Sequence, residues 1–197
     1  MVKIDIGFFA HNESGKIGPT LESLFRQDIF SCPSFSTRVH LLANGCTDQT
    51  VAEASSVATL SGLTERINIH DLPEGGKSRT WNLFAHDLSR PTAEFLLFMD
   101  ADIRIPESDM LRKLIGFVSD HPNLAGASSN ATKDIVYDPS LRRGLMDALI
   151  GAAGGTLGDW KDSICGQLYV LRSEVARSFH LPIGLPVEDG FIRAMVQ

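Results

Sequence analysis

The most constraining feature of this sequence is a regular alternation of strand-like and helix-like segments up to Pro122. The strand-like segments are rich in β-branched and aromatic residues, and apolar residues at helical spacing follow each of them. Four successive β-then-α units predict a parallel sheet that is covered by helices on both faces. The predicted strands are residues 3–11, 37–45, 66–72 and 94–102, and the predicted helices are residues 17–25, 46–62, 75–89 and 108–122.

The second half of the chain is less regular. Residues 124–132 and 165–172 predict further strands, and residues 138–155, 173–179 and 186–197 predict helices. The sequence contains no internal repeat, low-complexity tract or clear linker. We therefore expect one α/β domain over residues 1–197, with a doubly wound, mostly parallel sheet.

Composition narrows the functional classes. The 197 residues are 43% hydrophobic and 21% charged, as in a soluble α/β protein, and the net charge of -6 argues against nucleic acid as a partner. No apolar run approaches the roughly 20 residues of a membrane span. The three cysteines have no CxxC spacing, which predicts a reduced, cytoplasmic environment without disulfides or a thiolate zinc site.

Polar clusters follow each of the four predicted parallel strands. They are HNES at 11–14, ANGCTD at 43–48, PEGGK at 73–77 and DAD at 100–102. In a doubly wound sheet, ligands bind beyond the carboxyl ends of the strands, so these clusters are expected to share one edge. Each cluster taken singly also fits an ordinary turn or helix cap.

Two carboxylates end the most apolar of these strands. Asp100 and Asp102 project to the same side if the strand persists that far. Their mutual repulsion calls for a positive partner, and paired carboxylates suit a hard divalent cation such as Mn²⁺ or Mg²⁺. The alternative is a solvated turn in which one carboxylate caps the loop.

Two further motifs carry candidate site residues. Gly75 and Gly76 would let the backbone approach a ligand closely, and Lys77 could bind phosphate or lie on the surface. Glu188 and Asp189 open a predicted helix, where one carboxylate could act as a general base. Judged on local sequence alone, ordinary acidic residues of a first helical turn explain this pair better.

Taken in order, these motifs resemble the family 2 glycosyltransferases, which have the GT-A (Rossmann-like) nucleotide-diphospho-sugar-transferase fold. Individual motifs are loose, but six in the same order are quite specific. The resemblance spans Ile4 to Arg193. The segments that carry it are residues 10–27, 43–54, 75–82, 99–105 (MDADIRI), 165–175 and 187–190 (VEDG).

The resemblance implies transfer of a sugar from a nucleoside diphosphate sugar to a hydroxyl acceptor, by an inverting displacement. Asp100 and Asp102 would then meet the divalent metal and the diphosphate, and Asp189 would deprotonate the acceptor with support from Glu188. The other implied donor contacts are Asn12 and Glu13 by the nucleoside, Asn44 and Asp48 near the base, and Gly76 and Lys77 bordering the nucleotide pocket. A UDP-sugar is the expected donor, and a glycan or a lipid-linked molecule the expected acceptor.

This sequence departs from the family pattern at two places. Many relatives carry an acidic residue where this chain has Ala43, so the choice of base among uracil, guanine and thymine is open. Relatives also continue past the Glu-Asp helix, often with an arginine-rich acceptor segment and sometimes with membrane spans, whereas this chain stops at Gln197. We expect either a domain truncated at its C-terminus or a minimal version of it, with membrane association possible only through residues it lacks or through a lipid acceptor.

Three alternatives stay open at this point. A sugar-phosphate nucleotidyltransferase would carry a glycine- and arginine-rich loop after the first strand, where this chain has Asn12 and Glu13. An aspartyl-phosphate phosphatase would carry its Asp-X-Asp motif near the N-terminus. A GT-A domain that binds nucleotide without turnover is disfavoured by the presence of Asp100, Asp102 and Asp189.

Overall fold

The computed structural model describes residues 1–130, 132, 136, 144–152 and 164–196. Its strands are β1 (Val2–Ala10), β2 (Phe35–Asn44), β3 (Ile67–Leu72), β4 (Phe95–Asp100), β5 (Gly126–Ser128) and β6 (Leu168–Arg172). Its α-helices are α1 (Ile17–Phe25), α2 (Thr50–Leu60), α3 (Lys77–Asn82), α4 (Met110–Asp120), α6 (Leu145–Ala152), α7 (Ser173–Ala176) and α8 (Glu188–Val196). Two 3₁₀ segments, η1 (Asp28–Phe30) and η2 (Thr64–Arg66), and a π-helical segment, η3 (Leu83–Leu88), complete the elements.

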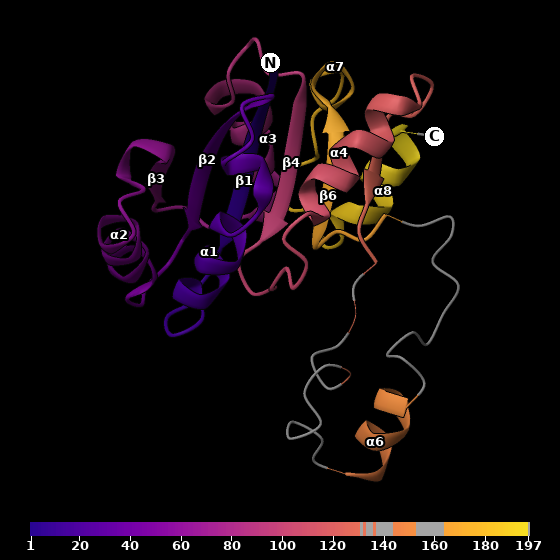
Figure 1. Ribbon diagram of the computed structural model, residues 1–197. Helices are drawn as coiled ribbons and strands as arrows, with labels where there is room; N and C mark the ends of the chain where they lie inside the picture. Colours follow the sequence, from indigo (N-terminus) through magenta and orange to yellow (C-terminus); the bar gives the residue numbers. More distant parts are fainter. Residues whose placement is uncertain (131, 133–135, 137–143, 153–163, 197) are drawn as a thin grey trace.

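The described strands form one sheet in the order β3-β2-β1-β4-β6-β5 (Figure 1). The first four run parallel, which confirms the four β-then-α units predicted from the sequence. β6 runs antiparallel to both β4 and β5. Consequently the start of β6 lies at the same edge of the sheet as the carboxyl ends of the parallel strands.

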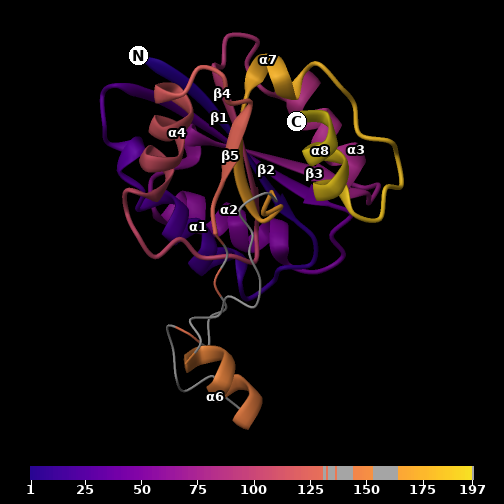
Figure 2. The same cartoon turned by 90° about the vertical axis from the view of Figure 1, so that its right-hand side faces the viewer.

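Helices cover both faces of the sheet, which confirms the predicted doubly wound class (Figure 2). Alternate strand residues point to opposite faces, so one strand can serve two cores. In β4, Leu97 packs with the core beneath α1, α2 and α4, whereas Leu96 and Phe98 pack with the core beneath α3, α7 and α8. The parallel strands are therefore apolar on both sides, as their sequences predicted.

Aromatic side chains form much of the core beneath α3 and α8. The ring of Phe98 stacks against those of Trp81 and Tyr169, with centroid separations of 5.0 Å and 4.8 Å. The indole N–H of Trp81 donates a hydrogen bond to the hydroxyl of Tyr169 over 2.8 Å. This layer joins α3, β4 and β6 on this face of the sheet.

The predicted helix at residues 138–155 lies only partly within the described residues, where α6 covers Leu145–Ala152. The views of Figures 1 and 2 both show α6 apart from the sheet. No helix among the described residues is both long enough and apolar enough to cross a membrane.

Candidate functional site

Five of the sequence-predicted site residues meet at the carboxyl edge of β1, β2 and β4. They line a cavity of about 150 Å³ whose lining residues are Phe9, Ala10, His11, Glu13, Asn44, Lys77, Asp100, Ala101 and Asp102. Gly76 lies next to this cavity, because it immediately precedes Lys77 at the start of α3. The parallel strand order therefore brings together side chains that are far apart in the sequence.

Lys77 holds the centre of the site. Its ammonium lies 3.0 Å from each carboxylate oxygen of Asp100 and 2.6 Å from Oε1 of Glu188. All three side chains are partly or largely shielded, with 38%, 23% and 11% of the side-chain surface of Lys77, Asp100 and Glu188 exposed. One positive charge thus links the end of β4 to the start of α8, two elements that the sequence alone did not connect.

The electrostatics of the site favour an added positive charge. Burial is the main cause that raises the pKa of the Asp100 carboxyl to about 6; the ammonium of Lys77 opposes this rise, and the nearby carboxylates of Asp102 and Glu188 add to it. Burial would lower the pKa of Lys77, but its ion pairs with Asp100 and Glu188 outweigh that effect and raise the pKa overall. The ammonium is therefore charged, and the carboxylates around it outnumber it.

Glu188 and Asp189 begin α8, as the sequence predicted. Glu188 is buried and pairs with Lys77, whereas Asp189 is half-buried and lies against Gly166. Burial, followed by the charge of Glu188, raises the pKa of Asp189 above its usual range. A carboxylate with a raised pKa is a stronger base than a solvated one, which suits proton abstraction from a hydroxyl.

Asn12 and Asp48 hold two loops together. The side-chain oxygen of Asn12, a residue with a φ of 54°, accepts a hydrogen bond from the backbone N–H of Thr47 over 2.8 Å. The carboxylate of Asp48 accepts from the backbone N–H groups of Ser14 and Thr50, each over 3.0 Å. Both side chains therefore stabilise the loops after β1 and β2. Their predicted contacts with the nucleotide stay predictions.

The second loop meets the third through two glycines. A Cβ at Gly45, whose φ is 63°, would lie 2.9 Å from backbone atoms of Gly75, so position 45 does not tolerate a side chain, whereas a Cβ at Gly75 would meet no atom within 4 Å. Asn44, at the end of β2, accepts a hydrogen bond from the hydroxyl of Thr80 over 3.0 Å. The close backbone approach predicted at Gly75 is thus made to another loop of the protein.

The donor set at the end of β4 fits a hard divalent cation. Asp100 and Asp102 both offer carboxylate oxygens, the ligands that such a cation prefers, and both residues line the cavity. Within the described residues, no three His, Cys, Asp or Glu side chains gather as a metal-binding group. Among the residues that the structure describes, Asp100 and Asp102 would hold the cation, and the oxygens of a diphosphate are further ligands of the kind that it prefers.

Sequence reasoning missed three residues of the site. His11 lines the cavity, with its Nδ1 2.7 Å from the carbonyl oxygen of Asn44, and its place in the polar cluster after β1 was the available signal. Tyr169 is buried under the site near Glu188, Asp100 and Asp189, and burial raises its pKa well above the usual range. Gly166 contacts Asp189, and nothing in the sequence indicated that contact.

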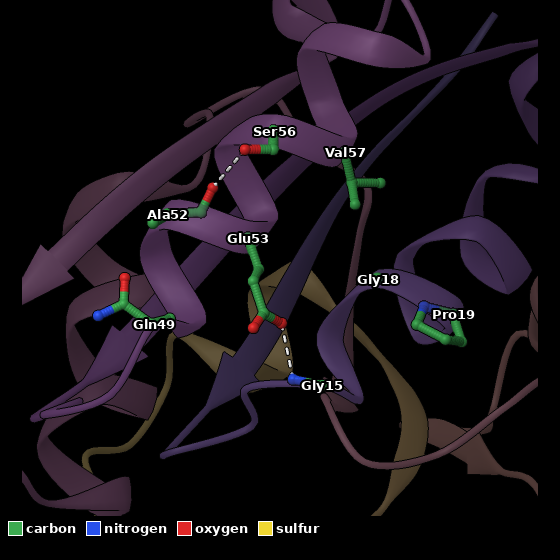
Figure 3. Close-up of a pocket in the computed structure, with 8 residues that line it drawn as sticks. All are labelled: Gly15, Gly18, Pro19, Gln49, Ala52, Glu53, Ser56 and Val57. Carbon is green, nitrogen blue, oxygen red and sulfur yellow. Dashed lines mark hydrogen bonds between the residues drawn. The ribbon is translucent and has the colours of Figure 1, made fainter.

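A larger cavity of about 420 Å³ lies between α1 and α2 (Figure 3). Its one carboxylate, Glu53, already accepts hydrogen bonds from the hydroxyl of Ser14 and the backbone N–H of Gly15. None of the carboxylates of the candidate site lines it. The smaller cavity at the sheet edge therefore carries the chemistry.

Comparison with known proteins identifies the family. The model of "Glycosyl transferase family 2" matches residues 6–169. The chain belongs to glycosyl transferase family 2. This confirms the resemblance drawn from the motif order, and the matched stretch contains β2, α3 and β4, which carry Asn44, Lys77 and Asp100. A search of curated proteins found no match.

Solved structures agree with the family 2 assignment. A mannosyltransferase from Pyrobaculum calidifontis, in complex with GDP-Man and Mn²⁺, has a TM-score of 0.70 at 17% identity, with 96% of this chain and 50% of that one covered. S. aureus TarS 1-349 has a TM-score of 0.67 at 16% identity, with coverages of 99% and 55%, and its complex with UDP-GlcNAc has a TM-score of 0.64 at 17% identity, with coverages of 99% and 53%. At such identities the likeness shows the GT-A fold. The chain spans about half the length of these structures.

Proposed function

We propose that this protein transfers a sugar from a nucleoside diphosphate sugar, with a UDP-sugar as the expected donor, to a hydroxyl group of an acceptor. The main structural support for this proposal is that Lys77 forms ion pairs with both Asp100 and Glu188. It joins the strand end on which the donor diphosphate would lie to the helix start that carries the proposed base. Family membership supports the reaction class, and solved relatives bind GDP-Man or UDP-GlcNAc.

The donor side consists of Lys77, Asp100 and Asp102. The ammonium of Lys77 would pair with diphosphate oxygens, as a compact positive charge does. Asp100 and Asp102 would hold Mn²⁺ or Mg²⁺, which would stabilise the negative charge of the departing nucleoside diphosphate. Asn44, Glu13 and Gly76 border this space and would contact the nucleotide.

The acceptor side consists of Asp189 and Glu188. Asp189 would take the proton of the acceptor hydroxyl as that oxygen bonds to the anomeric carbon and the bond from this carbon to the diphosphate oxygen breaks. A single displacement of this kind inverts the anomeric configuration. The negative charge of Glu188 helps to raise the pKa of Asp189, which makes Asp189 a stronger base.

Nucleotide binding tests the donor assignment. Calorimetric titration of UDP, GDP, dTDP and CDP, each with and without Mn²⁺, should show Mn²⁺-dependent binding of UDP. Asp100→Ala should weaken that binding by more than about tenfold, because one of two proposed carboxylate ligands is lost. Binding of UDP that is equally tight in both proteins and indifferent to Mn²⁺ would contradict the proposed metal site.

Turnover tests the base. Asp189→Asn keeps the size of the side chain but removes its basicity, so transfer from the donor sugar should fall by roughly 10²- to 10⁴-fold. UDP binding in the presence of Mn²⁺ should stay at the wild-type level, because Asp189 lies on the acceptor side. A variant that transfers sugar at the wild-type rate would remove Asp189 from the mechanism.

A further inference from the structure

The backbone from Cys165 to Gln167 contacts the end of β4 and the start of α8 and is anchored at both ends. The backbone N–H of Asp100 donates a hydrogen bond to the carbonyl of Gln167 over 2.9 Å. The N–H of Cys165 donates to the hydroxyl of Ser128 over 3.2 Å. This segment is therefore fixed to the end of β4 on one side and to β5 on the other.

Gly166, in the middle of this segment, contacts the carboxyl group of Asp189. A Cβ at Gly166 would lie 2.4 Å, 2.5 Å and 2.6 Å from Oδ1, Cγ and Oδ2 of Asp189, far inside van der Waals contact. The Gly166 backbone also gives the carboxylate a hydrogen bond, which acts to lower its pKa. The carboxylate thus occupies the space that any other residue would fill with its side chain.

The backbone conformation does not itself require glycine at this position. Five described glycines have a positive φ, and Gly166 is not among them. An alanine could adopt its backbone angles, so the need for glycine comes from the space above its Cα. This separates Gly166 from Gly76, where a φ of 139° disfavours any side chain.

We propose that Gly166 is a positioning residue for Asp189, and this rests on the proposed role of Asp189 as the base. The anchored segment sets where the carboxylate lies relative to Asp100, the end of the donor site. A methyl group at position 166 forces the carboxylate away from the acceptor hydroxyl, while the donor residues keep their places. Displacement of a reacting group by about 1 Å can reduce a rate 100-fold.

Kinetics of Gly166→Ala test the proposal against a matched control. We expect kcat to fall about 100-fold, with UDP affinity in the presence of Mn²⁺ within about twofold of wild type. Gly190→Ala adds the same methyl group beside Asp189, where a Cβ has no atom within 4 Å, and should keep the wild-type kcat. An unchanged kcat in Gly166→Ala, an equal loss in Gly190→Ala, or a parallel loss of UDP affinity would overturn the proposal.

Thermal unfolding tests the contact without any activity. Gly166→Ala should lower Tm by a few degrees in the wild-type background, but by less when Asp189→Ala has removed the carboxylate. An equal change in Tm in both backgrounds would overturn the contact. If the wild-type protein transfers no sugar while the Tm changes remain coupled, the proposed function fails and the positioning contact stands.

Discussion

Lys77 shows how one residue can stabilise a site built from distant parts of the chain. Its two partners, Asp100 and Glu188, follow it by many residues, and each would face a like charge without it. The sequence predicted that Lys77 borders the site but could not predict the pair with Glu188. That contact depends on how α8 packs against α3 and β4, which no local pattern determines.

Replacement of Lys77 tests its part in donor binding. Lys77→Met should weaken UDP binding in the presence of Mn²⁺ by about tenfold, the value of one charge-assisted hydrogen bond, because the diphosphate loses an ammonium partner. Calorimetry gives the affinity. Lys113→Met is a suitable control, since Lys113 pairs with Asp109 outside the site, 2.9 Å away. Equal affinities in both variants would remove Lys77 from the donor site.

Each strand-and-helix unit carries its own pattern in the sequence, which is why the first four units could be predicted. The antiparallel direction of β6 could not, because the direction of a strand depends on the path of the preceding chain. The π-helical segment Leu83–Leu88 was also missed: its apolar residues, such as Phe84 and Ala85, fit an ordinary helix equally well. The spacing of apolar residues within one helix or strand is visible in the local sequence. The direction of β6 and the π-helical turn instead depend on how separate elements pack together.

Strand β1 depends on a glycine that faces a ring. A Cβ at Gly7 would lie 2.7 Å from the ring of Phe84, which is fully buried. Gly7→Ala should therefore lower the free energy of unfolding by about 1–3 kcal/mol through overpacking. Urea unfolding followed by circular dichroism measures this. The control is Gly116→Ala in α4, where a Cβ meets no neighbouring atom, and it should leave the free energy of unfolding unchanged or raise it. An unchanged free energy of unfolding in Gly7→Ala would show that Phe84 can move to make room for the methyl group.

The stability of the whole molecule should depend on pH through a buried histidine. Burial lowers the pKa of His40 to about 4; the carboxylate of Asp5 opposes this shift, and His70, Arg38 and Arg90 add to it. Between pH 6.5 and pH 4 the unfolded chain binds a proton at His40 that the folded protein does not. Stability should thus be fully present above pH 6.5 and fall by up to about 3 kcal/mol as the pH drops to 4.

Urea unfolding at several pH values measures this dependence. His40→Asn should flatten the curve between pH 6.5 and pH 4, although His70, whose pKa burial also lowers, leaves a remainder. Parallel curves for the two proteins would show that His40 is not the group responsible.

The antiparallel course of β6 divides the site along the sequence. Every proposed donor residue precedes position 103, whereas Gly166, Glu188 and Asp189 come from the single stretch 164–196. Under the proposed roles, the residues of the acceptor side thus follow one another in a single stretch of chain, separate in sequence from the donor residues. The contacts that join this stretch to the donor residues include the pairing of β6 with β4, the hydrogen bond of Gln167 with Asp100, and the ion pair of Lys77 with Glu188. Under the proposed roles, substitutions within that stretch would alter acceptor use and leave the donor residues unchanged.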